Sequence, residues 1–337
     1  MSEPPPDAWA IELPATVIGV ERLVSCLAEA REQIGRIIFG QETVIEQTLI
    51  TLLAGGHALL IGVPGLAKTR LVQTLGRVFG LEDKRVQFTP DLMPADILGS
   101  EILEESDTGQ RSFRFLKGPV FAQLLMADEI NRASPRTQSA LLQAMQEQRV
   151  SVAGQSYDLP WPFHVLATQN PLEQEGTYPL PEAQLDRFLM QVDVGYPDRD
   201  AERRMLIATT GIAEAPLVPV TSAAMLRAMQ RLVRHIPVGE SVIDAILTVV
   251  RAGRPEESPL PLVHRHVAWG PGPRASQALL LAARARAVLD GRLAPSIDDV
   301  LALVQPVLRH RMALTFAARA EGVTIASVIE TLCQTIC

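Results

Sequence analysis

Residues 62–69, with the sequence Gly-Val-Pro-Gly-Leu-Ala-Lys-Thr, constrain the fold of this 337-residue chain more than any other stretch. They follow a short apolar run at residues 57–61, and a helical pattern of apolar residues begins at Lys68. A strand, a glycine-containing turn and a helix N-terminus together are typical of a phosphate-binding loop, because backbone N–H groups and the helix dipole attract anions there. An ordinary strand–turn–helix connection is the alternative interpretation.

The side chains of several residues in this loop indicate how it would bind phosphates. Lys68 would add a positive charge for the outer phosphates, and Thr69 would offer a hydroxyl group to Mg²⁺. Ala67 stands where the strict pattern has glycine, which is a departure of one methyl group. The positions that we expect to surround the phosphates are Gly62, Val63, Pro64, Gly65, Leu66, Ala67, Lys68 and Thr69.

Two adjacent carboxylates, Asp128 and Glu129, end a second apolar run at residues 121–127. At the end of a buried strand they would be costly without partners, and at the carboxyl edge of a parallel sheet they would face the phosphate loop. We expect Asp128 to hold Mg²⁺ through water and Glu129 to polarise the attacking water. The alternative is a surface pair that caps the helix near Ser134.

Two polar positions farther along the chain are candidates for contact with the phosphates. Asn170 follows a strand-like run at residues 163–168, so its amide could bind the γ-phosphate or the attacking water; a simple turn before Pro171 is the other interpretation. Arg187 could form a structural ion pair with Asp186 or Glu182, or it could reach the nucleotide of a neighbouring subunit as an arginine finger. Spacing alone does not choose between these two roles.

Taken together, these segments resemble an AAA+ ATPase of the MoxR family, and the likeness runs from about Ile38 to Arg311. In the segment at residues 270–275, the family more often has the sequence Gly-Ala-Ser-Pro-Arg. Pro271 and Gly272 differ from that sequence, whereas Arg274 agrees with it. The matching segments are residues 62–69 (Walker A), 87–99 (a segment typical of MoxR proteins), 124–129 (Walker B), 128–133 (MoxR-like wording), 167–171 (sensor 1), 180–188 (the arginine-finger segment) and 270–275 (sensor 2).

The resemblance implies specific roles for individual residues. Asn170 would be sensor 1, Arg187 a finger that acts on the neighbouring subunit, and Arg274 a sensor 2 that acts on the γ-phosphate of its own subunit. A simple exposed arginine in a first helical turn is the alternative for Arg274. Gly40 and Gln41 would lie near the adenine.

The resemblance also implies a function and partners. We expect ATP and Mg²⁺ as cofactors, a homo-oligomeric and most simply hexameric ring, and a chaperone that remodels or matures protein complexes and assists metal or cofactor insertion. A protein with a von Willebrand factor A domain and the client complexes would be its partners. A magnesium-chelatase-type subunit is a close alternative that the wording of residues 87–99 disfavours.

Apolar periodicity predicts the architecture. The predicted strands alternate with helical segments, which indicates a mostly parallel, three-layer α/β sheet. The resemblance implies that this sheet is the core of a P-loop NTPase. We expect a flexible tail over residues 1–16, an ATPase domain over 17–199 and an all-helical lid over 200–337. The predicted strands are residues 57–61, 85–88, 123–127, 163–168 and 188–193. The predicted inserted hairpins are residues 98–116 and 149–159. The resemblance implies that both hairpins lie near the pore of the ring, and the alternative is two surface hairpins without a function.

Composition excludes some other functions. A net charge of −7 argues against a generally basic nucleic-acid motor or loader. The three scattered cysteines indicate neither zinc nor a disulfide frame, and the acidic N-terminus and the lack of long apolar runs predict a cytoplasmic protein. His264 and His266 have no third ligand nearby, so we expect a solvated loop there instead of a metal site.

Overall fold

A five-stranded sheet with the order β2-β5-β8-β1-β9 forms the centre of the molecule. The computed structural model describes residues 17–105, 111–173, 175–210 and 217–336; the predicted tail, the turn of the first hairpin at 107–109 and Cys337 lie outside the described residues. Each neighbouring strand pair is parallel, as predicted. The strands are β1 (Ala58–Ile61), β2 (Asp83–Gln87), β5 (Leu124–Asp128), β8 (His164–Gln169) and β9 (Met190–Asp193).

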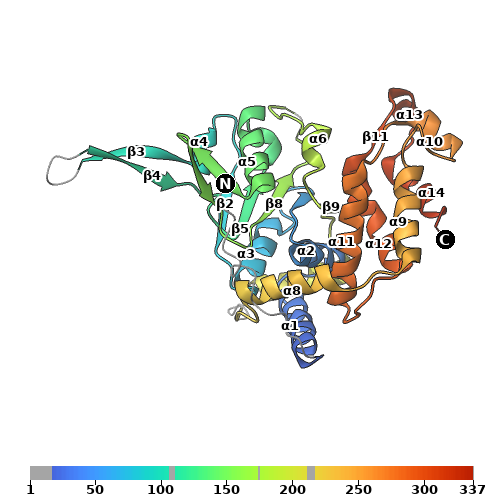
Figure 1. The fold of residues 1–337 in the computed structure, drawn as a ribbon, viewed down its shortest axis with the longest axis horizontal. Coiled ribbons are helices and arrows are strands. Elements are labelled where there is room, and N and C mark those ends of the chain that lie inside the picture. The colour runs from blue at the N-terminus through green and yellow to red at the C-terminus, as the bar shows by residue number, and fades with distance from the viewer. Residues whose placement is uncertain (1–16, 106–110, 174, 211–216, 337) are drawn as a thin grey trace.

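Helices cover both faces of this sheet because successive strand residues point to opposite sides. In β1, Leu60 joins the core that contains α2 (Glu42–Ala54) and α3 (Lys68–Val78), whereas Leu59 joins the core that contains α5 (Pro135–Glu147). Figure 1 shows α5 on one side of the strands and α2 and α3 on the other. The three-layer α/β fold is therefore confirmed.

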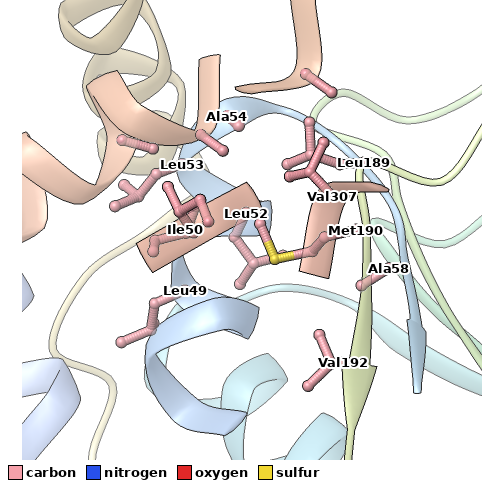
Figure 2. Packing of buried hydrophobic residues seen from close by; sticks show 14 of the residues in the cluster. Leu49, Ile50, Leu52, Leu53, Ala54, Ala58, Leu189, Met190, Val192 and Val307 are labelled. Atoms are coloured by element: carbon pink, nitrogen blue, oxygen red, sulfur yellow. The ribbon is translucent and has the colours of Figure 1, made fainter. Parts of the chain in front are cut away.

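The larger core continues past residue 200 into the C-terminal helices. Helix α11 (Pro273–Leu289) packs against both α2 and α12 (Ile297–Leu308), and α12 contacts β9. Figure 2 shows apolar side chains from α2, β9 and α12 in this shared core. The division at residue 199 stays a prediction, because the apolar packing runs across it.

An ion-pair network ties the same helices together. Arg286 of α11 lies 2.9 Å from Glu46 of α2 and 2.7 Å from Asp299 of α12. Burial alone would raise the pKa of Asp299, but hydrogen bonds from Arg292, Ser296 and Arg286 lower it to about 2. The buried carboxylate is therefore ionised and paired.

The C-terminal part is mostly helical but not all-helical, which corrects the prediction. Strands β10 (Val267–Trp269) and β11 (Ala313–Leu314) pair antiparallel. Runs of two or three residues are too short to show alternation in the sequence. The remaining helices are α7 (Arg199–Thr210), α8 (Ala223–His235), α9 (Glu240–Ala252), α10 (Pro261–His266), α13 (Phe316–Ala320) and α14 (Ile325–Cys333), with a 3₁₀ turn η3 (Arg309–Arg311).

The histidines of this region are a second correction. His264 and His266 lie in α10, and His266 is buried, so the expected solvated loop is wrong.

Within the described residues, no helix is long and apolar enough to cross a membrane.

Both predicted hairpins are present. The first consists of β3 (Gly99–Glu105) and β4 (Arg111–Lys117), and it extends well away from the sheet in Figure 1. The second consists of β6 (Arg149–Val152) and β7 (Gln155–Asp158). The other helical elements are α1 (Val17–Gly35), α4 (Pro94–Leu98), α6 (Glu182–Leu185) and the 3₁₀ turn η2 (Ile130–Arg132).

Candidate functional site

The carboxyl ends of the central strands open onto a pocket of about 440 Å³. Gly62 and Val63 line an adjoining pocket of about 380 Å³ that shares Leu66 with the first. The structure thus brings the loop and the acidic pair together. The predicted residues that line the larger pocket are Pro64, Gly65, Leu66, Ala67, Lys68, Thr69, Asp128, Glu129 and Asn170, and they are joined by Arg70, Arg85, Gln87 and Thr168.

The loop between β1 and α3 has the backbone shape of an anion cradle. A Cβ atom on Gly62 would lie 2.5 Å from the carbonyl oxygen of Val194, so only glycine allows the loop to pack this closely on β9. Gly65 and Ala67 have φ angles of +87° and +56°. Left-handed backbone at Ala67 explains why the strict pattern has glycine there, and the alanine costs on the order of 1 kcal/mol.

Lys68 begins α3 and turns back onto its own loop, where its ammonium group donates a hydrogen bond to the carbonyl oxygen of Gly62. Burial lowers the pKa of Lys68, while the charges of Asp128, Glu129 and Glu173 act in the opposite direction. Lys68 is half-buried and lines the pocket, where its positive charge would attract an anionic ligand.

Asp128 ends β5 as a buried carboxylate with charged and polar partners. Thr168 Oγ1 donates to its Oδ1 atom at 2.5 Å, and Arg85 donates to its Oδ2 atom from Nη2 at 2.5 Å and from Nε at 3.1 Å. Burial is tolerated because both oxygens are paired. A guanidinium from β2 thus neutralises the carboxylate that we expect to hold Mg²⁺.

Glu129 is held on the pocket side by two side chains. Its Oε2 atom accepts from Gln87 Nε2 at 2.7 Å and from Arg132 Nη1 at 3.0 Å. Its backbone, at φ +55°, donates to Thr168 Oγ1 at 2.9 Å. The helix-cap alternative is wrong, because Ser134 is the residue that caps α5.

Sequence reasoning missed Arg85, Gln87, Thr168 and Arg132. Arg85 and Gln87 stand two residues apart on β2 with the buried Val86 between them, so both point to the same side. That alternation at the end of a strand was the available signal. Their bonds to Asp128 and Glu129 depend on the pairing of β2 with β5, which the sequence does not show.

Asn170 is buried and lines the pocket, while its Oδ1 atom accepts a hydrogen bond from the backbone of Leu172 at 3.1 Å. The turn interpretation is therefore confirmed. The predicted contact with the γ-phosphate stays a prediction.

Gly40 and Gln41 lie beside the loop. The buried Gln41 places its Nε2 atom 3.5 Å from the carbonyl oxygen of Leu66. A Cβ atom on Gly40 would lie 2.4 Å from Cβ of Ala201, which fixes this segment against the start of α7. Their contact with adenine stays a prediction.

Arg187 and Arg274 lie near each other but do not line this pocket. Arg187 donates to the carbonyl oxygen of Leu142, and burial followed by the charge of Arg274 lowers its pKa. Arg311, not Arg187, forms the close ion pair with Asp186, at 2.7 Å, and Arg274 lies 3.9 Å from the same carboxylate. Arg274 thus lies outside the pocket of its own subunit in this structure, and its predicted contact with the γ-phosphate stays a prediction.

Comparison with known proteins agrees with this geometry. Residues 57–190 match the model of the ATPase family associated with various cellular activities, and residues 261–332 match the AAA lid domain. The chain is 43% identical to "Chaperone MoxR1" of Mycobacterium tuberculosis over 96% of this chain and 85% of that protein. It is 33% identical to "Protein MoxR" of Paracoccus denitrificans over 85% of this chain and 88% of that protein.

A solved structure supports the same assignment. A candidate ATPase from Cytophaga hutchinsonii superposes with a TM-score of 0.87 and 36% identity, covering 94% of this chain and 96% of that chain. The matched ATPase region contains the phosphate loop, Asp128, Glu129 and Asn170. The chain therefore belongs to the MoxR family of AAA+ ATPases, proteins that bind nucleotide and hydrolyse ATP.

Proposed function

We propose that this chain hydrolyses Mg-ATP as a ring of identical subunits, most simply a hexamer, and uses the cycle to remodel or mature protein complexes. The observation that carries the proposal is a division of the charged groups. The phosphate loop and both carboxylates meet in one pocket, while Arg187 and Arg274 gather elsewhere, around Asp186. Each nucleotide pocket thus lacks Arg187 and Arg274 of its own subunit. A neighbouring subunit can supply both arginines to it.

The pocket contains groups suited to each part of the reaction. Lys68 and the loop N–H groups would hold the phosphates. The hydroxyl of Thr69 and the carboxylate of Asp128 are hard oxygen donors that fit Mg²⁺, which would neutralise phosphate charge when bound. Glu129 would orient the attacking water, and Gln87 and Arg132 hold its carboxylate in place.

Arg187 and Arg274 would stabilise charge on the γ-phosphate of the neighbouring subunit. Arg187 already places one nitrogen on the carbonyl oxygen of Leu142 in α5, so the backbone of its own chain positions it. An arginine finger contributes on the order of 10³–10⁵ in rate. Hydrolysis should therefore depend on assembly.

The purpose of the cycle rests on family membership. The M. tuberculosis relative is named a chaperone, which supports work on protein complexes, with metal or cofactor insertion as one form of it. We propose a von Willebrand factor A domain protein as the partner.

The first hairpin could contact the partner or a client protein, since it exposes Leu103, Phe113 and Leu116 by 54%, 73% and 52%. The cytoplasmic location stays a prediction.

Steady-state Mg-ATP hydrolysis across a series of protein concentrations tests the proposal. We expect the activity per subunit to rise with concentration and then level off, because the complete site needs two copies. Glu129→Gln should bind ATP but lose hydrolysis by at least about 100-fold. Activity per subunit that is flat at all concentrations, with light scattering that shows assembly across the same range, would contradict the shared site.

A further inference from the structure

A second pocket, of about 550 Å³, lies at the opposite end of the sheet from the nucleotide site. It forms where Trp161, Pro162 and the start of β8 face helix α8. His164 at the start of β8 lines this pocket, and Asn170, just beyond the end of β8, lines the nucleotide pocket. The two pockets therefore lie at opposite ends of strand β8. The proposed ATPase mechanism uses none of the residues that line the second pocket.

The lining of this pocket is strongly positive. Arg227, Arg231 and Arg234 line it from α8, and their spacing of four and three residues puts them on one side of the helix. None of the described residues that line the pocket is acidic. His164 adds no charge at neutral pH, because burial lowers its pKa to about 4. Three like charges around one hollow favour an anionic ligand.

Arg231 presents the most specific feature. Its Nε and Nη2 atoms are both buried and have no hydrogen-bond partner among the described residues. These two nitrogens share one edge of the guanidinium, and that edge binds a carboxylate or phosphate through two parallel hydrogen bonds. Buried donors of this kind are costly unless a partner satisfies them.

Part of the remaining wall is apolar and includes an aromatic ring. The guanidinium of Arg227 lies 5.2 Å from the centroid of the Trp161 ring, and its Nη1 atom donates to the Trp161 carbonyl oxygen at 3.0 Å. Pro162 and Phe163 continue this wall. A volume of about 550 Å³ lies within the range of pockets that hold small organic ligands, roughly 300–1,000 Å³.

We propose that this pocket binds a small organic anion. Its carboxylate or phosphate group pairs with the Nε–Nη2 edge of Arg231, which a movement of that side chain opens to the pocket, because both nitrogens are closed to solvent in this structure. Arg227 and Arg234 add positive charge, and the apolar or planar body of the ligand packs toward Trp161 and Pro162. The site is distinct from the nucleotide pocket, and ligand binding there does not require ATP hydrolysis.

Isothermal titration of the full chain tests this site with three probes: phthalate, phenyl phosphate and the neutral phthalamide. Saturating Mg-ADP is present throughout, so that the phosphate loop does not bind the anions. We expect one equivalent of phthalate or phenyl phosphate to bind, with no saturable binding of phthalamide. The preferred anion identifies carboxylate or phosphate as the natural group.

Matched variants make the test specific. Arg231→Gln should weaken anion binding at least about tenfold, and Arg231→Lys should recover part of it, because lysine keeps the charge but lacks the two-nitrogen edge. Arg22→Gln, at an exposed arginine of α1, should change nothing. Equal binding by wild type and a folded Arg231→Gln, or no saturable binding of either anion up to about 10 mM, overturns the proposal.

Discussion

At the scale of single residues, the site combines one strained position with several positioning contacts. Ala67 has the left-handed backbone that favours glycine, yet it opens α3 directly before Lys68. The sequence showed only that a methyl group departs from the strict pattern. The structure adds the physical reason, which is the sign of φ.

Ala67→Gly should therefore stabilise the protein by about 0.5–1 kcal/mol, because relief of the left-handed strain exceeds the added entropy of the unfolded chain. Urea unfolding measures this change. Ala28→Gly is the control, since this exposed alanine lies in the interior of helix α1 and its replacement by glycine should cost about 1 kcal/mol. Equal destabilisation by both changes would mean that the strain at Ala67 has no energetic weight.

Gln87 is a positioning residue for Glu129, because its Nε2 atom donates to that carboxylate at 2.7 Å. Gln87→Ala should lower kcat for ATP roughly tenfold and leave KM nearly unchanged, since the phosphates bind elsewhere in the pocket. Gln143→Ala is a matched control, because Gln143 makes a similar bond to Glu147 on the outside of α5. A rise in KM at constant kcat would assign Gln87 to nucleotide binding instead.

At the scale of elements, the sequence predicted the features that carry long or repeated signals. Four of the five parallel strands left clear apolar runs, and both hairpins left turn residues, whereas β2 contains Val86 as its one apolar residue. Strands β10 and β11 left no such signal, because they are two or three residues long. The position of Arg274 was also unpredictable, because the motif places it at the start of α11 but packing decides which surface that helix end faces.

Two buried histidines join neighbouring strands of the sheet and make its stability depend on pH. His57 accepts a hydrogen bond at Nδ1 from the backbone of Val165 at 2.9 Å, and His164 lies with Nδ1 2.8 Å from the carbonyl oxygen of Gly56. Burial lowers the pKa of His57 to about 3 and that of His164 to about 4. Both rings are therefore neutral in the folded protein.

The unfolded chain binds these two protons near pH 6.5, whereas the folded chain resists them until about pH 3–4. The stabilisation is complete above pH 6.5 and falls as the pH drops, by up to about 1.4 kcal/mol per pH unit for each histidine. Urea unfolding between about pH 7 and pH 5 measures the slope. His164→Gln should reduce this slope by up to about 1.4 kcal/mol per pH unit, because one proton fewer is taken up on unfolding. His264→Gln, at an exposed histidine, should leave the slope unchanged. A stability of the wild type that does not change with pH over this range would contradict this account.

At the scale of the whole molecule, one apolar core joins the sheet to the C-terminal helices, and this sets where the charged groups can act. Helix α11 packs on α2 and on α12, and its Arg286 bridges Glu46 of α2 and Asp299 of α12. Arg274 at the start of α11 therefore lies near Asp186 and Arg187. The central claim is that these arginines complete the pocket of another subunit.

Mixing two inactive variants tests that claim most directly. Glu129→Gln removes the group that orients water in a subunit's own pocket, and Arg187→Ala removes the group supplied to its neighbour. In a randomly mixed ring, about one interface in four pairs an intact Glu129 with an intact Arg187, so an equimolar mixture should recover about a quarter of the wild-type ATPase rate. If the mixture is as inactive as each variant alone, while pull-down of one affinity-tagged variant shows that it shares rings with the other, the shared active site is wrong.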